Sequence, residues 1–132
     1  MEVKLVLDTN AYCLCDVNQE RALELVERAA SLFLPSIVYG ELYYGFRHGK
    51  RFESNLKRLD QFIEEYDVQI IQVDIDVARK FGDIFSSLRK KGTPIPTNDI
   101  WIAACCMSVG GTLLTSDHHF KKVEQIQTEF ID

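Results

Sequence analysis

The sequence lacks the features that mark repeat, linker or membrane-spanning proteins. Its 132 residues include only three prolines and seven glycines, and they contain no internal repeat, no low-complexity stretch and no long uninterrupted apolar run. The segment MEVKLVLDTN has too few apolar residues for a secretory signal or a membrane span, so we expect a soluble, cytoplasmic protein. The mass of 15.2 kDa and the 46% hydrophobic content predict one domain over residues 1–132.

Positive charge is also scarce. Fifteen basic residues against twenty acidic ones give a net charge of -5, which argues against a protein that coats nucleic acid through bulk electrostatics. The basic residues are nevertheless clustered, and Arg47, Lys50 and Arg51 are our candidates for phosphate contacts. The alternative is that these residues only form the solvated face of a helix.

The four cysteines do not follow the spacing of a disulfide scaffold. Cys13, Cys15, Cys105 and Cys106 lie in apolar sequence, so we expect reduced, largely buried thiols. A zinc site that combines the first two cysteines with the histidine pair at 118–119 matches no recognised ligand spacing.

The hydrophobic pattern predicts strands that alternate with helices. Short aliphatic runs predict buried strands at residues 3–7, 32–34, 70–73 and 112–115, and a last edge strand near residue 130. Helices are expected to start after a cap at Asn18, after a cap at Ser36, near residue 51, at Asp74 or Asp76, and near Asp99. Parallel neighbours need crossover connections, so this order predicts a three-layer α/β/α fold with a mainly parallel central sheet.

Four acidic residues lie where this fold would bring them together. Asp8 and Asp117 each follow a strand, and Asp99 opens a helix. Glu41 lies in the segment IVYGELYYGF, which is so apolar that it predicts a mostly buried helix. Ligands bind outside the carboxyl ends of parallel strands, which is the edge that these positions share. Each acid also has a structural alternative: a helix cap, an acid that favours the helix dipole, a turn, or, for Glu41, an ion pair with Arg47.

The chemistry of these acids favours a metal ion. Four carboxylates in one pocket stay ionised only if a cation neutralises them. We expect the buried charge of Glu41 to be bound in this way, and we expect the start of a helix to lower the pKa of Asp99. A set of oxygen ligands without cysteine or histidine suits Mg²⁺, or alternatively Mn²⁺.

The segments LVLDTN, ELYYG, GTPIPTNDIWIAA and GTLLTSDHHF resemble, in this order, the successive motifs of the PIN-domain family, and in particular the VapC toxins. The resemblance covers essentially the whole chain and implies a single PIN-like domain with Mg²⁺- or Mn²⁺-dependent ribonuclease activity. It assigns the catalytic and metal-binding positions to Asp8, Glu41, Asp99 and Asp117. The supporting polar neighbours are Thr9, Asn10 and Ser116.

The resemblance also implies an RNA substrate, a small antitoxin protein as partner, and a homodimer. A PIN-fold binding module without catalytic activity remains an alternative, and so does an aspartyl-phosphate phosphatase with Asp8 as nucleophile. Exposed tyrosines near the acids are candidates for stacking on bases, although Tyr39, Tyr43 and Phe46 follow a helical stripe that favours the core or a subunit interface. For the histidine pair at 118–119 we expect a solvated turn, with phosphate contact or proton transfer as the alternative.

Overall fold

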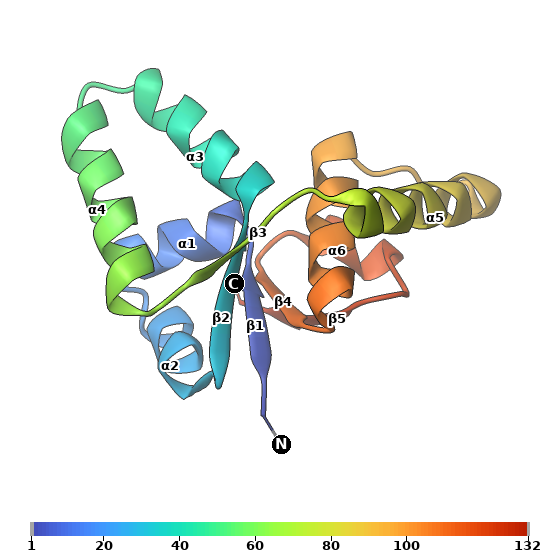
Figure 1. Cartoon of the computed structure of the whole chain (residues 1–132), viewed down its shortest axis with the longest axis horizontal. Coiled ribbons are helices and arrows are strands. Elements are labelled where there is room, and N and C mark those ends of the chain that lie inside the picture. The colour runs from blue at the N-terminus through green and yellow to red at the C-terminus, as the bar shows by residue number, and fades with distance from the viewer. Residues whose placement is uncertain (1, 132) are drawn as a thin grey trace.

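The computed structural model describes residues 2–131, which form a parallel sheet with helices on both faces (Figure 1). The strands are β1 (Lys4–Leu7), β2 (Ser31–Pro35), β3 (Gln69–Ile71), β4 (Thr112–Thr115) and β5 (Gln127–Phe130). The helices are α1 (Thr9–Asp16), α2 (Glu20–Arg28), α3 (Ser36–Arg47), α4 (Phe52–Glu65), α5 (Ile75–Lys91) and α6 (Thr97–Val109), with a short 3₁₀ turn, η1 (His118–Lys122).

The five strands run in the order β3-β2-β1-β4-β5, and every neighbouring pair is parallel. Helices α1, α2 and α4 lie on one side of the sheet, and α5 and α6 lie on the other (Figure 1). The predicted three-layer α/β/α fold is therefore confirmed, including the edge strand near residue 130. The strand order reverses between β1 and β4, so the carboxyl ends of these two strands flank the crevice where such sheets bind ligands.

Strand β4 approaches β1 closely because a glycine precedes it. A Cβ atom on Gly111 would lie 2.8 Å from Val6 Cγ2 and 3.0 Å from the carbonyl oxygen of Lys4. No side chain fits at those distances without movement of the neighbouring strand. The glycine thus lets the two strands that flank the crevice pair in register, with Leu7 opposite Leu114.

The ends of the helices differ in detail from the sequence-based expectation. Asn18 has a left-handed backbone with φ of 61°, and the cap of α2 is Gln19, whose side chain accepts a hydrogen bond from the Ala22 amide. Ser36 is the first residue of α3 and follows Pro35, so it is not the cap. Asp74 caps α5 as expected, and α6 begins two residues before Asp99.

Helix α6 is buried on nearly every side, whereas α3 is not. The stretch 102–106 of α6 is fully covered, and α5 packs alongside, where Phe81 stacks on Trp101 with ring centroids 3.8 Å apart. In α3 only Val38 and Leu42 are buried. The expectation of a mostly buried α3 was wrong, because α3 and α4 form a hairpin that extends beyond the edge of the sheet and leaves its outer faces to solvent (Figure 1).

The cysteines are all free, as predicted. Cys15, Cys105 and Cys106 are buried, and only Cys13, on the outer side of α1, departs from the expected burial. Burial raises the pKa of the Cys106 thiol to about 12, so this thiol stays protonated near neutral pH. Within residues 2–131, no helix combines the length and the apolarity needed to cross a membrane.

Candidate functional site

Asp8 stands at the end of β1 and is only 4% exposed. Its Oδ1 accepts a hydrogen bond of 2.8 Å from the Ala11 amide, which caps α1, and its Oδ2 accepts a short one from Thr115 Oγ1. The cap and a site in the crevice are therefore compatible uses of one carboxylate. Burial raises the pKa of Asp8 to about 6, and the negative charges of Asp117 and Asp99 add to this, although both hydrogen bonds oppose the shift.

Asp99 and Asp117 meet across the crevice at the imidazole of His119. The Nδ1 atom of His119 lies 3.4 Å from Asp99 Oδ2 and 3.2 Å from Asp117 Oδ1. Burial and then the charge of Asp117 raise the pKa of Asp99, while the hydrogen bond and charge of His119 oppose the shift. The expectation that the helix start lowers the pKa of Asp99 was wrong, because burial and the neighbouring acids outweigh the helix dipole.

Asp117 also forms a turn, which was the structural alternative to metal binding for this residue. Its Oδ1 accepts a 2.9 Å hydrogen bond from the His119 amide and so opens η1. Its own amide donates to Thr115 Oγ1 at 2.9 Å. The turn fixes the backbone around Asp117, and its side chain still faces the other acids, since its charge raises the pKa of both Asp8 and Asp99.

Thr115 is the member of the site that the sequence reasoning missed. It is fully buried, and its hydroxyl bridges the Asp8 carboxylate and the Asp117 amide. The sequence analysis named the neighbouring hydroxyl residue, Ser116, as a support of the site, and Ser116 is partly buried. The available signal was local: strand β4 ends in a hydroxyl residue two positions before an acid, which is a frequent arrangement for a side chain that bonds the backbone two residues on.

Glu41 reaches the same crevice from α3 and is partly buried. Its Oε1 accepts a 2.8 Å hydrogen bond from Thr9 Oγ1, and its Oε2 lies 3.5 Å from Asn98 Nδ2. The proposed structural pairing with Arg47 is not formed, since the guanidinium of Arg47 lies over the Phe52 ring, 4.9 Å from its centroid. The charge of Glu41 contributes to the raised pKa of Asp99, while the charges of Asp99 and Asp117 contribute to that of Asp8, which links the four predicted acids in one region.

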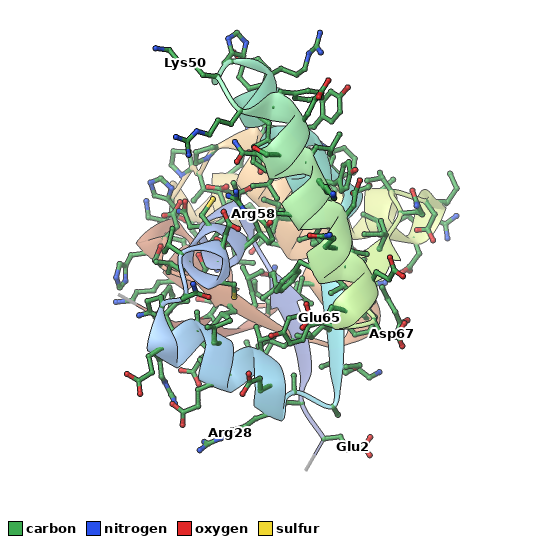
Figure 2. All side chains as sticks on the ribbon, turned by 90° about the vertical axis from the view of Figure 1, so that its left-hand side faces the viewer. Glu2, Arg28, Lys50, Arg58, Glu65 and Asp67 are labelled. Atoms are coloured by element: carbon green, nitrogen blue, oxygen red, sulfur yellow. The ribbon has the colours of Figure 1, made fainter. Side chains whose placement is uncertain are left out.

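The other predicted residues lie at different distances from the acids. Thr9 takes part through Glu41, whereas Asn10 is exposed in the first turn of α1. Lys50 and Arg51 are exposed in the connection between α3 and α4, and Figure 2 shows Lys50 at the tip of this hairpin. His118 turns away from its neighbour and stacks on Phe130, with ring centroids 4.9 Å apart and an interplanar angle of 7°.

The acids at the crevice form a set of ligands that suits a cation. Oxygen atoms of Asp99 and Asp117 and a nitrogen of His119 all lie within 4.8 Å of one another, and across residues 2–131 this is the one such group of three ligands. Divalent ions bind such sets, and a bound cation would favour the ionised forms of Asp8 and Asp99, whose pKa is raised by burial first and then by the neighbouring negative charges. The cysteines do not join this group, so it does not match the zinc site considered above. It also differs from the expected set of four oxygen ligands, because His119 belongs to it while Asp8 and Glu41 do not.

Comparison with known proteins identifies the family. The PIN domain family matches residues 5–126. Ribonuclease VapC2 of Haemophilus influenzae is 33% identical over 132 residues, covering 96% of this chain and 97% of the relative. Ribonuclease VapC2 of Rickettsia felis is 30% identical over 130 residues, covering 94% of this chain and 95% of the relative.

A solved structure shows the same fold. The crystal structure of VapBC2 from Rickettsia felis, bound to a DNA fragment from their promoter, contains a chain that superposes with a TM-score of 0.87. It is 27% identical in sequence, and the match covers 98% of this chain and 100% of that one. The chain therefore belongs to the PIN-domain family, in which it is a relative of the VapC proteins.

Proposed function

We propose that this protein is a metal-dependent endoribonuclease that hydrolyses RNA phosphodiester bonds as the toxin of a type II toxin-antitoxin pair. The relatives named ribonucleases support the activity, and the VapBC complexes among the similar structures support the toxin role. The observation that carries the proposal is the clustering of acids at the carboxyl edge of the sheet, where burial and then the charges of neighbouring acids raise the pKa of Asp8 and of Asp99. Such a set favours a divalent ion, and we propose Mg²⁺, with Mn²⁺ as the alternative.

The four acids would hold the ion, and their neighbours would orient them. Thr115 and the amide at the start of α1 fix both oxygens of Asp8. Thr9 at the start of α1 and Asn98 at the start of α6 each donate a hydrogen bond to one oxygen of Glu41. When bound, a divalent ion supplies Lewis-acid chemistry, because it polarises phosphoryl oxygens and makes water more acidic. The protein itself holds these carboxylates in place, because Asp8 and Glu41 accept hydrogen bonds from hydroxyl and amide groups of neighbouring elements.

The phosphatase alternative, with Asp8 as nucleophile, has less support than metal-assisted hydrolysis. An aspartyl-phosphate enzyme needs a second acid just after its nucleophile, whereas Thr9 and Asn10 follow Asp8. The similar proteins are named ribonucleases.

We propose that the RNA lies along the outer face of α3. Glu41 is on this helix, and Tyr44, about one turn further on, is 66% exposed. The Tyr44 ring packs against His48, with centroids 4.3 Å apart, and the rest of its surface is available for stacking on a base. Arg47, Lys50 and Arg51 lie beyond it, towards the tip of the hairpin. A helix rises about 1.5 Å per residue, so the step from Glu41 to Arg47 is about 9 Å. An RNA strand held at the acids would thus place its flanking phosphates near the basic tip.

We also propose that the chain acts in the cytoplasm as a single PIN-like domain, that it forms a homodimer, and that a small antitoxin protein inhibits it. Light scattering of the purified chain tests the dimer. Co-expression with the product of a short upstream reading frame tests the antitoxin, which should relieve growth inhibition and co-purify with the chain. Growth inhibition that no adjacent product relieves would argue against the toxin role.

Cleavage of RNA tests the activity. The purified chain is incubated with structured and single-stranded RNA in Mg²⁺ or in EDTA, beside the variants Asp8→Asn and Asp99→Asn. The matched control is Asp83→Asn, which removes an exposed acid from α5. We expect cleavage in Mg²⁺ only, with losses of at least about 100-fold in the two site variants and none in the control. Cleavage in EDTA, or full activity in both site variants, would overturn the proposal, and a complete lack of activity would favour a binding module.

A further inference from the structure

His119 has a position that its neighbour in the sequence does not share. Its Nδ1 atom faces both Asp99 and Asp117, at 3.4 Å and 3.2 Å, while its side chain remains 49% exposed. His118, one residue earlier, stacks on Phe130. Because the two histidines differ in orientation, the chain provides a natural control for any property assigned to His119.

The distances around His119 match the spacing of ligands on a single ion. Two ligands at right angles on an ion, each about 2.1 Å from it, lie about 3 Å apart. The separations of 3.2 and 3.4 Å are close to that value, and the three ligand atoms all lie within 4.8 Å of one another. An ion bound by the two carboxylates would therefore also lie within reach of the imidazole nitrogen.

The imidazole is compatible with both the empty and the occupied site. A neutral imidazole carries one N–H, on either ring nitrogen. With the proton on Nδ1, the ring donates to the carboxylates. With the proton on Nε2, Nδ1 presents a lone pair to the same region, and the partial exposure of the side chain leaves room for Nε2–H to bond to water. The amide of His119 donates to Asp117 Oδ1 at 2.9 Å, so one of the carboxylates also holds the backbone of His119 in place.

We propose that His119 Nδ1 is a nitrogen ligand to the divalent ion held by Asp99 and Asp117, and that it shifts the preference of the site away from Mg²⁺ and towards transition-metal ions. The inference rests on the metal site of the proposed function. Mg²⁺ takes oxygen ligands almost exclusively, whereas imidazole nitrogen suits transition metals such as Co²⁺ and Ni²⁺. A site of carboxylates with one imidazole therefore discriminates between these ions more strongly than a site of carboxylates alone.

Metal binding tests this inference without reference to cleavage. The full chain is purified with an affinity tag that lacks histidine, and Mn²⁺ is added as the paramagnetic probe. Pulsed electron paramagnetic resonance then detects the coupling of a ligating ¹⁴N nucleus to the bound ion. We expect this coupling in the wild type and in His118→Ala, and its loss in His119→Ala. Titration calorimetry with Co²⁺ and with Mg²⁺ gives the ratio of the two dissociation constants for each protein.

The preference ratio separates a ligand from a merely structural residue. In His119→Ala the preference for Co²⁺ over Mg²⁺ should fall by at least about tenfold, since even outer-shell substitutions change metal affinity by that much. His119→Asp restores a ligand, but an oxygen one, so it should bind Mg²⁺ more tightly than the wild type does. A loss of affinity for both ions by the same factor would mean that His119 only positions the acids, which overturns the proposal.

The remaining outcomes distinguish a failure of the role of His119 from a failure of the metal site itself. Tight Mn²⁺ binding without a nitrogen coupling would overturn the role of His119 and leave the carboxylate site intact. An absence of Mn²⁺ and Mg²⁺ binding to the wild type would overturn the metal site itself and, with it, the role of His119. A nitrogen coupling that persists in His119→Ala and disappears in His118→Ala would identify His118 as the nitrogen ligand and so refute the proposal.

Discussion

Replacing Asp8 by asparagine should stabilise the protein in the absence of metal. The pKa of Asp8 is raised from 3.8 to about 6 in the folded chain, so folding is opposed wherever the carboxylate must stay ionised. At about 1.36 kcal/mol per pKa unit, the shift corresponds to about 3 kcal/mol of lost stability at pH 7.5. Asparagine removes the charge and is itself a good helix cap, so the hydrogen bond to the start of α1 can be kept. Its Nδ2 replaces the oxygen that accepts from Thr115, so the Thr115 hydroxyl must turn and accept a hydrogen bond from Nδ2 instead.

The sign of this effect depends on pH. Below pH 3.8 the carboxyl group is protonated in both the folded and the unfolded chain, and the contribution disappears. As the pH rises towards 6, only the unfolded chain releases the proton easily, and the wild type loses stability relative to the variant. The advantage of Asp8→Asn should therefore grow from about 1 kcal/mol at pH 4.5 to about 3 kcal/mol at pH 7.5.

Urea unfolding followed by circular dichroism at both pH values, in EDTA, measures the two differences. Addition of Mg²⁺ at about 100 times its dissociation constant should stabilise the wild type by about 2.7 kcal/mol and so remove most of the gap at pH 7.5. The exposed Asp83→Asn should stay within about 0.5 kcal/mol of the wild type throughout. A variant at Asp8 that is less stable than the wild type at pH 7.5, or a gap of equal size at both pH values, would refute the reasoning.

Three further predictions concern the supports of the site. Thr115→Val should lower the free energy of unfolding by about 1–3 kcal/mol, because the Asp117 amide then loses its hydrogen-bond acceptor inside the protein. Thr115→Ser keeps the hydroxyl and should retain most of the wild-type stability. Urea unfolding of both variants measures the two effects. Gly111→Ala should destabilise the protein by about 1–3 kcal/mol, because the new Cβ atom would contact the neighbouring strand β1. The control is Gly82→Ala, where a Cβ atom on α5 would meet no neighbour. In the same assay this control should be neutral or stabilising by up to about 1 kcal/mol. Replacing Arg47, Lys50 and Arg51 by alanine should weaken RNA binding and leave the metal affinity unchanged. The slope of log affinity against log salt concentration should fall by up to about 3. Fluorescence anisotropy at several salt concentrations measures this slope, and an unchanged slope would contradict the prediction.

The sequence predicted the positions of those site residues that directly follow a strand. Asp8 and Asp117 follow buried strands, and parallel strands bring their carboxyl ends to one edge, so their meeting could be predicted. The role of Thr115 depends on the register of β4 against β1, which local patterns do not specify. The pKa of Asp99 was predicted in the wrong direction, because its neighbours come from residues far along the chain.

The exposure of α3 was equally beyond local reasoning. Its sequence is as apolar as that of a buried helix, and a single sequence does not reveal how far the α3–α4 hairpin extends from the sheet. Glu41 was expected to be a buried charge held by a metal ion or by Arg47, yet it is only partly buried and receives hydrogen bonds from Thr9 and Asn98. Both donors come from neighbouring elements, which only the assembled fold brings to this helix.

The stack of Phe81 on Trp101 has a practical consequence. Trp101 is the sole tryptophan of the chain, it joins α6 to α5, and it lies two residues after Asp99 in the same helix. The tryptophan fluorescence of the protein therefore comes from one indole, which lies at the packing contact of these two helices. The separation of α5 from α6 can thus be followed with a single built-in optical signal, without attaching a dye.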